Sequence, residues 1–375
     1  MKIPLCIPDI DHEEINLVTE VLKSGWLTHG PKNKQFEEDF AKYMGVRHAV
    51  TLNSCTSALH LAIQAQGLKG EVIVPSFTFS ASANSIVNAG CKPIFAEIDY
   101  DTCNIDPQKI KEKITKKTVG IMPVHFAGQS CKMDEIMEIA EKHSLAVIED
   151  AAETIGGEYA GKKAGTFATG CYSFFPTKNM TTGDGGMLTT NDDNIAEMVN
   201  VLKGHGMSST TFERERKEKP WLRASIAAGY NFRMCDILAA VGIVQLKKLD
   251  RMNDLRRKHA AYLNKELSGI QQIELPVEDR KAKHVYQMYT VKLDTNMVNR
   301  GAFLAKLKDK GIGASVHFDP PVHLQPYYMK MGWKKGDFPV TEKVSDSIVT
   351  LPMYPGMKKE ELDYMISMIE DAVKY

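Results

Sequence analysis

Short apolar segments alternate along the chain with longer segments in which apolar residues recur at helical spacing. Between residues 48 and 150 each apolar segment leads through a turn into a helix-like segment. Apolar strands that alternate with helices predict a mostly parallel sheet covered by helices on both faces, with ligands bound beyond the carboxyl ends of the strands. The expected strands are His48–Leu52, Glu71–Pro75, Pro93–Ile98, Thr118–His125 and Leu145–Asp150, and the expected helices are Thr56–Gln66, Ala81–Ala89 and Met133–His143.

Two amphipathic helices, Asp11–Leu22 and Gln35–Met44, are expected before the first strand. The segment between them, Ser24–Pro31, is rich in glycine and proline but also carries bulky apolar residues. It is either a substrate-facing loop or a buried connection, and we favour the loop because functional residues concentrate on loops. The charged stretch Met207–Arg223 has the composition of a surface loop.

The pattern changes near residue 250. A long charged helix is expected over Asp250–Leu267, and after it strands such as Val285–Leu293 alternate with helices such as Arg300–Lys310. This predicts an α/β protein with a second, smaller α+β domain. The expected division is a large domain at 11–249 and a small C-terminal domain at 250–375, with residues 1–10 as candidates to pack on the small domain.

The composition narrows the classes of function. The chain has 375 residues, of which 43% are hydrophobic, and 47 basic residues balance 47 acidic ones. This balance favours neither nucleic acid nor an anionic membrane as a partner. No apolar run approaches the roughly 20 residues of a spanning helix, and the first residues lack the apolar core of a signal peptide. Seven cysteines without CxxC spacing indicate reduced thiols in a cytoplasmic protein, not a disulfide framework or a metal site.

One stretch, Cys171–Met187, combines the residues of a reactive site. An aromatic strand at Cys171–Phe175 ends at a proline, Lys178 follows, and the glycines of Gly183–Gly186 are expected to close a hairpin with a strand at Met187–Thr190. A lysine held on such a turn can form a Schiff base, although most loop lysines are simply solvated. Four hydroxyl side chains surround it and could serve an anion: Ser173, Thr177, Thr181 and Thr182. The stretch alone does not decide between these alternatives.

Polar and aromatic groups follow three of the expected strands. Thr56 opens a helix, where it is either a cap or part of an anion site. Two aromatic residues in Ser76–Ser80 are either core or a stacking face for a ring. Asp150 ends a buried strand beside Glu149, and a buried carboxylate needs a partner, which is either a protein group or a cation on a ligand.

Taken together, these groups suit one ligand. A lysine for an imine, an acid for a pyridinium, an aromatic for stacking, and N–H and hydroxyl donors for a phosphate are the four features that pyridoxal 5'-phosphate requires. No single motif carries this inference, but the joint fit favours this cofactor.

At this point the chain resembles the DegT/DnrJ/EryC1/StrS sugar aminotransferases, which have the fold-type I, aspartate aminotransferase-like architecture of pyridoxal-phosphate enzymes. The resemblance covers nearly the whole chain, with several long motifs in family order. The motifs are Gly25–Pro31, Pro75–Phe79, Val124–Gln129, Glu149–Ala152, Ser173–Asn179, Gly229–Met234, and His317 with Pro320 and His323.

The resemblance implies a role for each cofactor residue. Lys178 would form the Schiff base and shuttle the proton, Asp150 would keep the pyridine nitrogen protonated, and Phe79 would stack on the ring. Thr56, Ser57 and Ser173 would bind the phosphate. Asn231 would reach that phosphate from a neighbouring subunit, which implies a homodimer with shared active sites.

The resemblance also implies substrate contacts and shows two departures. Thr28, His29, Arg233, His317 and His323 would approach the substrate, although the last two could equally be structural histidines. The Met207–Arg223 loop would cross between subunits. Cys55 stands where the family has glycine. Glu153, near the cofactor's phenolic oxygen, stands where glutamine or histidine is commoner in the family. Perosamine synthase-like members resemble this chain in having glutamate there, and this tilts the expected chemistry toward sugar C4.

The implied reaction moves an amino group from glutamate to a 4-keto-6-deoxy nucleotide sugar. A 3-keto sugar is a close alternative, because the sequence does not show which carbon faces the cofactor. A dehydratase on the same fold is disfavoured by Lys178, which histidine replaces in that branch. A regulatory or DNA-binding protein is disfavoured by the zero net charge. The nucleotide and the sugar stereochemistry stay open.

Overall fold

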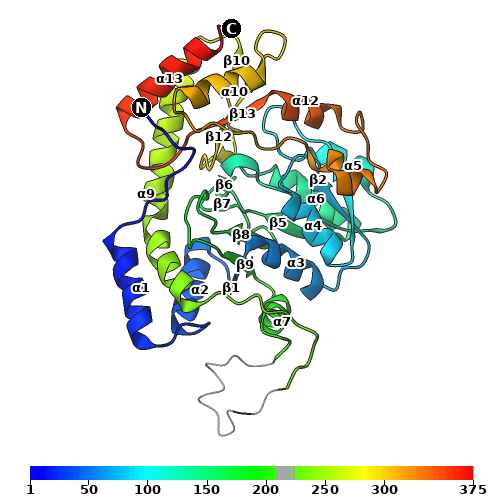
Figure 1. Ribbon diagram of the computed structural model, residues 1–375. Coiled ribbons are helices and arrows are strands. Elements are labelled where there is room, and N and C mark those ends of the chain that lie inside the picture. Colours follow the sequence, from blue (N-terminus) through cyan, green and yellow to red (C-terminus); the bar gives the residue numbers. More distant parts are fainter. Residues whose placement is uncertain (208–220, 222–223, 375) are drawn as a thin grey trace.

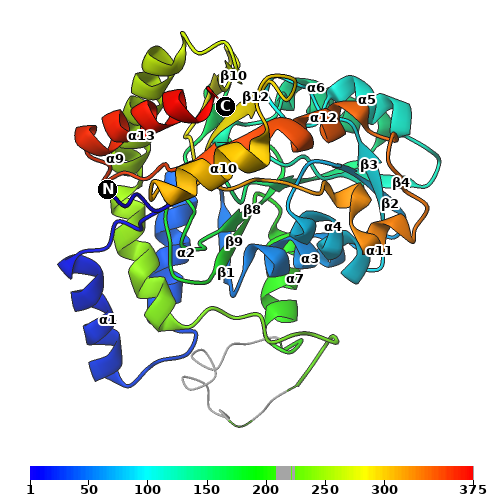
Figure 2. The ribbon, with the colours of Figure 1, turned by 45° about the horizontal axis from the view of Figure 1, so that its top comes forward.

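Successive residues of the central strands face opposite sides, and both sides are buried. The computed structural model describes residues 1–207, 221 and 224–374. In β2 (Glu71–Pro75), Val72 and Val74 join the apolar cluster on one face of the sheet, whereas Ile73 joins the cluster on the other. Strands that are apolar on both sides are stable only between two helical layers. Figures 1 and 2 show the helices stacked on the sheet accordingly.

In the described chain the central sheet has seven strands, and six of them run parallel. Only β9 runs in the opposite direction, pairing antiparallel with β1 and β8. The expectation of a mostly parallel sheet is therefore confirmed, and so is the hairpin across the glycine turn. The spatial order is β1 (His48–Leu52), β9 (Gly186–Thr190), β8 (Thr169–Ser173), β5 (Ala146–Asp150), β4 (Thr118–Ile121), β2 (Glu71–Pro75) and β3 (Lys92–Ala96).

Helices close both faces of this sheet. One face is covered by α3 (Cys55–Ala65), α4 (Ser80–Asn88) and α7 (Asp193–Lys203). The other is covered by α2 (Pro31–Met44), α5 (Pro107–Lys113), α6 (Met133–His143) and the first half of α9 (Asp236–Leu267). The carboxyl ends of the six parallel strands therefore meet at one edge that helices do not cover.

The C-terminal residues build a second core around a smaller sheet of β10 (Ile273–Glu274), β12 (Tyr289–Leu293) and β13 (Ile348–Leu351). It packs against the end of α9, α10 (Arg300–Asp309) and α13 (Lys359–Ala372). Ile3 is buried in the same core and bridges to Ile312, and both chain ends lie near α13 (Figure 1). The remaining elements are α1 (His12–Ser24), η1 (Phe126–Gly128), β6 (Glu158–Tyr159), β7 (Lys162–Lys163), β11 (Ala282–Lys283), η2 (Val322–Leu324), α11 (Pro326–Met329) and α12 (Pro339–Ser347).

Several expected elements differ in their bounds by up to four residues: the helix expected from Gln35 begins at Pro31, and the strand expected over Thr118–His125 ends at Ile121. Two further differences have a clear cause in the tertiary structure. Helix α9 begins at Asp236 instead of Asp250, because Ala239, Ile243 and Leu246 give its first turns an apolar face that packs on the sheet. The helix thus runs through residue 250, where the sequence suggested a domain boundary. The expected strand Val285–Leu293 begins only at Tyr289, because the backbone before it bonds to the η1 turn instead of a sheet.

Within the described residues, no helix is both long and apolar enough to cross a lipid bilayer.

The segment Ser24–Pro31 is anchored at its end by a residue far away in the sequence. Helix α2 has Gly30 at its N-cap, which offers no capping side chain. Asp236 of α9 replaces the cap: its carboxylate accepts the N–H groups of Gly30 at 2.9 Å, Lys32 at 3.1 Å and Asn33 at 3.1 Å. A Cβ at Gly30 would lie 2.0 Å from the indole nitrogen of Trp26. This end of the segment is therefore a fixed, buried connection.

We predict that Asp236→Ala lowers the free energy of unfolding by about 2 kcal/mol, because buried N–H groups at the start of α2 lose their acceptor. Urea denaturation followed by circular dichroism measures this change. Asp254→Ala removes an exposed acid from the same helix and serves as the control. Equal stability of the two variants would contradict the capping role.

Candidate active site

The carboxyl ends of the parallel strands open into a cavity of about 420 Å³. Its wall is formed by segments that follow β1, β2, β5 and β8, together with residues from the N-terminus and the C-terminal core. Seven of the residues expected to contact the cofactor or the substrate line this one cavity: Thr56, Phe79, Asp150, Glu153, Ser173, Lys178 and His317. Segments distant in the sequence thus converge at the edge that the topology leaves open.

One side of the cavity has the features of an anion site. Thr56 lies in the first turn of α3, whose first N–H groups have no intrahelical acceptors. Ser173 ends the neighbouring part of the sheet and adds a hydroxyl. Gly186 of β9 lies against the start of α3, where a Cβ would come within 2.3 Å of the Ser54 backbone. Ser57 does not line the cavity: its buried hydroxyl donates to the Asn53 side chain at 2.7 Å.

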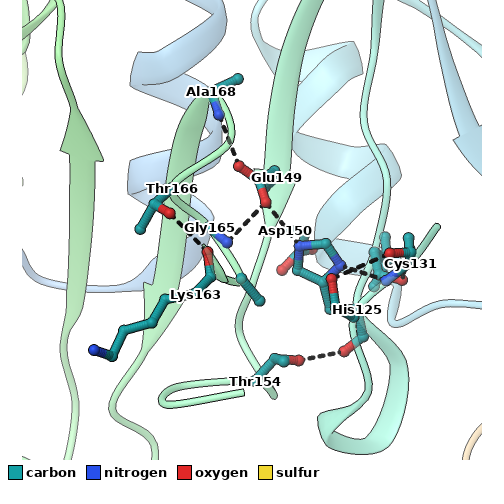
Figure 3. Close-up of polar contacts among 12 residues, drawn as sticks. His125, Cys131, Glu149, Asp150, Thr154, Lys163, Gly165, Thr166 and Ala168 are labelled. Carbon is teal, nitrogen blue, oxygen red and sulfur yellow. Dashed lines mark hydrogen bonds and ion pairs between the residues drawn. The ribbon is translucent and has the colours of Figure 1, made fainter. Parts of the chain in front are cut away.

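The two acids at the end of β5 have different surroundings, as Figure 3 shows for Glu149. Glu149 is fully buried, and its carboxylate accepts the N–H groups of Gly165 at 2.7 Å and Ala168 at 2.9 Å. It also lies 3.1 Å from Nε2 of His125, whose Nδ1 accepts the N–H of Cys131. Glu149 is therefore satisfied by the protein, and its role is structural.

Asp150 lines the cavity, and its partners are neutral groups, of which the Cys55 thiol at 4.0 Å from Oδ1 is a weak donor. The Ser82 hydroxyl donates to its Oδ2 at 2.7 Å, and the Ala152 N–H donates to its Oδ1 at 3.2 Å. No lysine, arginine or histidine of the described chain lies within ion-pair distance of it. Burial raises the pKa of the Asp150 carboxyl above its usual value. A cationic group placed in the cavity would therefore stabilise its ionised form.

Lys178 and Glu153 face each other across the same cavity. The Lys178 ammonium donates to Glu153 Oε1 at 3.2 Å, and the other carboxylate oxygen accepts the N–H of Ala127 at 2.9 Å. The lysine sits on the turn after β8, where its own N–H bonds to the Phe175 carbonyl at 2.9 Å. The acid that departs from the family pattern is thus the partner of the lysine.

An imidazole and an aromatic ring complete the lining. His317 Nδ1 lies 2.8 Å from the Thr350 hydroxyl, and burial, with the nearby Lys178 charge, lowers the pKa of this histidine. It is therefore neutral at pH 7. Phe79 stands at the start of α4 with 61% of its surface exposed, and its ring lies 6.1 Å from that of Phe318. A large apolar ring left this open can pack on a ligand.

His323 lies outside the cavity, contrary to the expected substrate contact. Its ring is fully buried, with Nδ1 2.5 Å from the Ser76 hydroxyl and Nε2 3.1 Å from the Glu342 carboxylate. Both nitrogens are thereby used within the protein. The alternative of a structural histidine, which the sequence left open, describes this position better.

Four other expected site residues do not line the cavity of their own chain: Thr28, His29, Asn231 and Arg233. Asn231 is on the surface, and its side-chain oxygen accepts a hydrogen bond from Arg233 at 2.9 Å. Thr28 is exposed, and His29 lies 3.9 Å from the Glu37 carboxylate. The Met207–Arg223 loop falls almost entirely outside the described residues.

Several cavity residues were not anticipated from the sequence. Ser82, which holds Asp150, is a serine inside a helix, and Thr78 precedes that helix. Leu5, Cys6 and Gln287 reach the wall from the N-terminus and the C-terminal core. No local pattern marks such residues, because only the tertiary fold brings them to the cavity.

Comparisons with known proteins agree with this fold. The model of the DegT/DnrJ/EryC1/StrS aminotransferase family matches residues 8–370. The chain is 41% identical to the spore coat polysaccharide biosynthesis protein SpsC of Bacillus subtilis, covering 99% of this chain and 97% of SpsC.

Two solved structures are similar over nearly the full length of both chains. S. venezuelae DesV, in complex with a ketimine intermediate, has a TM-score of 0.91 and 30% identity, covering 100% of this chain and 99% of DesV. Spr1654, described as a sugar aminotransferase of Streptococcus pneumoniae and solved in its PLP form, has a TM-score of 0.92 and 27% identity, with coverage of 100% and 99%.

The fold and the family match define an aminotransferase. The chain belongs to the DegT/DnrJ/EryC1/StrS aminotransferase family, whose sugar aminotransferases it resembles in sequence and in structure.

We predict that Asp150→Asn raises the Tm of the cofactor-free protein at pH 7. A carboxyl whose pKa is raised by folding costs stability once the pH exceeds its unfolded value of about 3.9, because ionisation is then easier in the unfolded chain. The gain should therefore vanish below about pH 4 and grow as the pH rises.

Thermal denaturation over this pH range measures the effect. Asp184→Asn changes an exposed acid of the same cavity and serves as the control. A Tm at pH 7 no higher than that of the control would show that Asp150 bears no such cost.

Proposed function

We propose that this enzyme uses pyridoxal 5'-phosphate to transfer an amino group from glutamate to a 4-keto-6-deoxy nucleotide sugar. The observation that carries the proposal is Asp150, a buried carboxylate that faces the cavity without a cation from the described chain. A protonated pyridine nitrogen is the cation that would satisfy it.

The residues of the cavity suit this cofactor by their chemistry. Thr56, Ser173 and the start of α3 offer donors to a phosphate, and Phe79 offers a ring face. Lys178 offers the amine, and Asp150 would hold the ring nitrogen. Each part of the cofactor, the phosphate, the ring face, the aldehyde and the ring nitrogen, would thus have a matching group in the cavity. The cavity therefore fits the cofactor that the family resemblance implies.

Each residue would have a defined task during transfer. Pyridoxal phosphate, when bound, supplies a carbonyl that condenses with amines and a ring that withdraws electrons. Asp150 would keep a proton on the ring nitrogen, which maintains that withdrawal. Lys178 would accept a proton from the amino donor's α-carbon and deliver a proton to the sugar carbon that receives nitrogen. Glu153 would hold the lysine ammonium between these steps.

Two features support the sugar and the position of amination. SpsC is named for polysaccharide biosynthesis, and the chain matches it end to end. Glu153 is the residue that perosamine synthase-like members share, which favours amination at C4. We further propose that the product enters a surface glycan or a related amino-sugar pathway.

A second copy of the chain would complete the site. Lys178 is the only lysine or arginine among the described residues that line the cavity, whereas the cofactor and a nucleotide sugar both carry phosphates. Phe79 and Phe175, 61% and 50% exposed, leave apolar surface at the same place. Asn231 is exposed and Arg233 is half-buried, both away from the cavity of their own chain, and they would reach a neighbouring cavity. We therefore propose a homodimer with shared sites.

We predict that wild-type protein with pyridoxal phosphate and glutamate aminates a 4-keto-6-deoxy nucleotide sugar, and that Lys178→Ala lowers turnover by at least about a thousandfold because no other amine moves the proton. Mass spectrometry of products from a panel of 4-keto and 3-keto sugars with several nucleotides measures this. Amination of 3-keto sugars alone would overturn the assignment to C4, and undiminished turnover by the variant would overturn the role of the lysine.

We also predict that Glu153→Gln makes Lys178 react faster with pyridoxal phosphate at pH 7. The amide still accepts the Ala127 N–H, but the ammonium form of the lysine loses the carboxylate that holds it at 3.2 Å. Stopped-flow absorbance measures the rate of Schiff-base formation. A rate equal to or below that of the wild type would mean that the ion pair does not restrain the lysine.

A further inference from the structure

A chain of two hydroxyl groups ends at Asp150. The Thr78 hydroxyl lies 2.8 Å from the Ser82 hydroxyl, which in turn donates to Asp150 Oδ2 at 2.7 Å. Thr78 and Ser82 are both almost completely buried, and both line the cavity. Because the Ser82 proton points to the Asp150 carboxylate, the Thr78 hydroxyl can only donate its proton to the Ser82 oxygen. The relay therefore has one direction, from Thr78 to Ser82 to Asp150.

The relay donates a hydrogen bond to Oδ2 of Asp150, whereas the backbone donates to Oδ1. The Ala152 N–H bonds to Oδ1, so without Ser82 the other oxygen would lose its only hydrogen-bond donor among the described residues. A hydrogen bond to a charged group contributes more than one between neutral groups, and successive hydroxyl bonds polarise one another. The relay thereby fixes the orientation of the carboxylate and favours its ionised form, in opposition to burial, which raises the pKa of Asp150.

We propose that Ser82, supported by Thr78, is a positioning residue that aligns and ionises Asp150 for the ring nitrogen of the cofactor. This inference rests on the proposed function. Ser82 acts through Asp150 and need not touch the ligand. Its loss would shift the shared proton from the ring nitrogen toward the carboxylate, which weakens the electron withdrawal that transamination needs.

Other charges act on the same carboxyl. Burial is the largest influence, and it raises the pKa of Asp150. The hydrogen bonds from Ser82 and the Ala152 N–H lower this pKa, the negative charge of Glu153 raises it, and the positive charge of Lys178 lowers it. The Cys55 thiol lies 4.0 Å from Oδ1, and Cys171 is buried nearby. Among the described side chains around Asp150, the Ser82 hydroxyl makes the short hydrogen bond to the carboxylate at 2.7 Å, whereas the Cys55 thiol is a weak donor at 4.0 Å.

The chain offers a matched control. Ser85 lies one turn further along α4, is equally buried, and donates to the Ser82 carbonyl at 2.7 Å without contacting Asp150. Ser82→Ala and Ser85→Ala thus remove the same atom from the same helix. Thr78→Val removes the first donor of the relay while keeping the shape of the side chain, so its effect should have the same direction as Ser82→Ala but be smaller. Ser82→Thr restores a hydroxyl and should rescue at least part of the loss.

The first measurement needs no cofactor. Carbon NMR of the cofactor-free protein with 13C-labelled aspartate, using Asp150→Asn to assign the signal, reports the pKa of Asp150. We expect Ser82→Ala to raise this pKa further and Ser85→Ala to leave it unchanged. An unchanged pKa in Ser82→Ala would overturn the proposal whatever the enzyme's cofactor is.

The second measurement uses the cofactor-loaded enzyme. We expect Ser82→Ala to lower kcat about tenfold, the effect of losing one charge-assisted bond, while the KM for glutamate changes less than about twofold. An equal fall in Ser85→Ala would indicate a packing effect and overturn the proposal. If wild-type protein neither binds pyridoxal phosphate nor turns over, the proposed function fails, and the NMR result still decides whether Ser82 ionises Asp150.

Discussion

The structure of the site depends on one buried carboxylate, Asp150, to which the described residues supply no cation. Asp150 ends a strand in the middle of the central sheet, where removal from water raises its pKa. Its neighbour Glu149 shows that the fold can satisfy an acid completely at the next position. The difference between the two identifies the cavity side of β5 as the place where a ligand must supply positive charge.

The topology then determines what surrounds that charge. Because β1, β2, β5 and β8 run parallel, their carboxyl ends lie along one edge, and the residues after each strand meet there. Strand β9 pairs antiparallel with β8, and the segment that connects the two strands carries Lys178 at the same edge. The C-terminal core and the N-terminal residues form the remaining wall, so a residue such as His317 reaches a cavity built mainly by the first half of the chain.

The sequence predicts the parts of this arrangement that have local or periodic causes. Alternating apolar strands and helices predicted the sheet, and the strand ends led to Thr56, Phe79 and Asp150, which do line one cavity. Contacts between distant segments had no such signal. Asp236 caps a helix some two hundred residues earlier in the chain, Ser82 lies on the buried side of α4, and His323 turned out to be enclosed by Ser76 and Glu342. Whether a polar side chain faces a cavity or a hydrogen-bond partner is decided by tertiary packing.

The most direct test of this account is the absorbance of the purified protein during a titration with pyridoxal phosphate. We expect a visible band from a Schiff base, which glutamate bleaches as the amino group moves to the cofactor and which a 4-keto nucleotide sugar restores. Protein that stays colourless after the addition, or a band that glutamate does not change, would contradict the assignment of Asp150 and Lys178 to this cofactor and this donor.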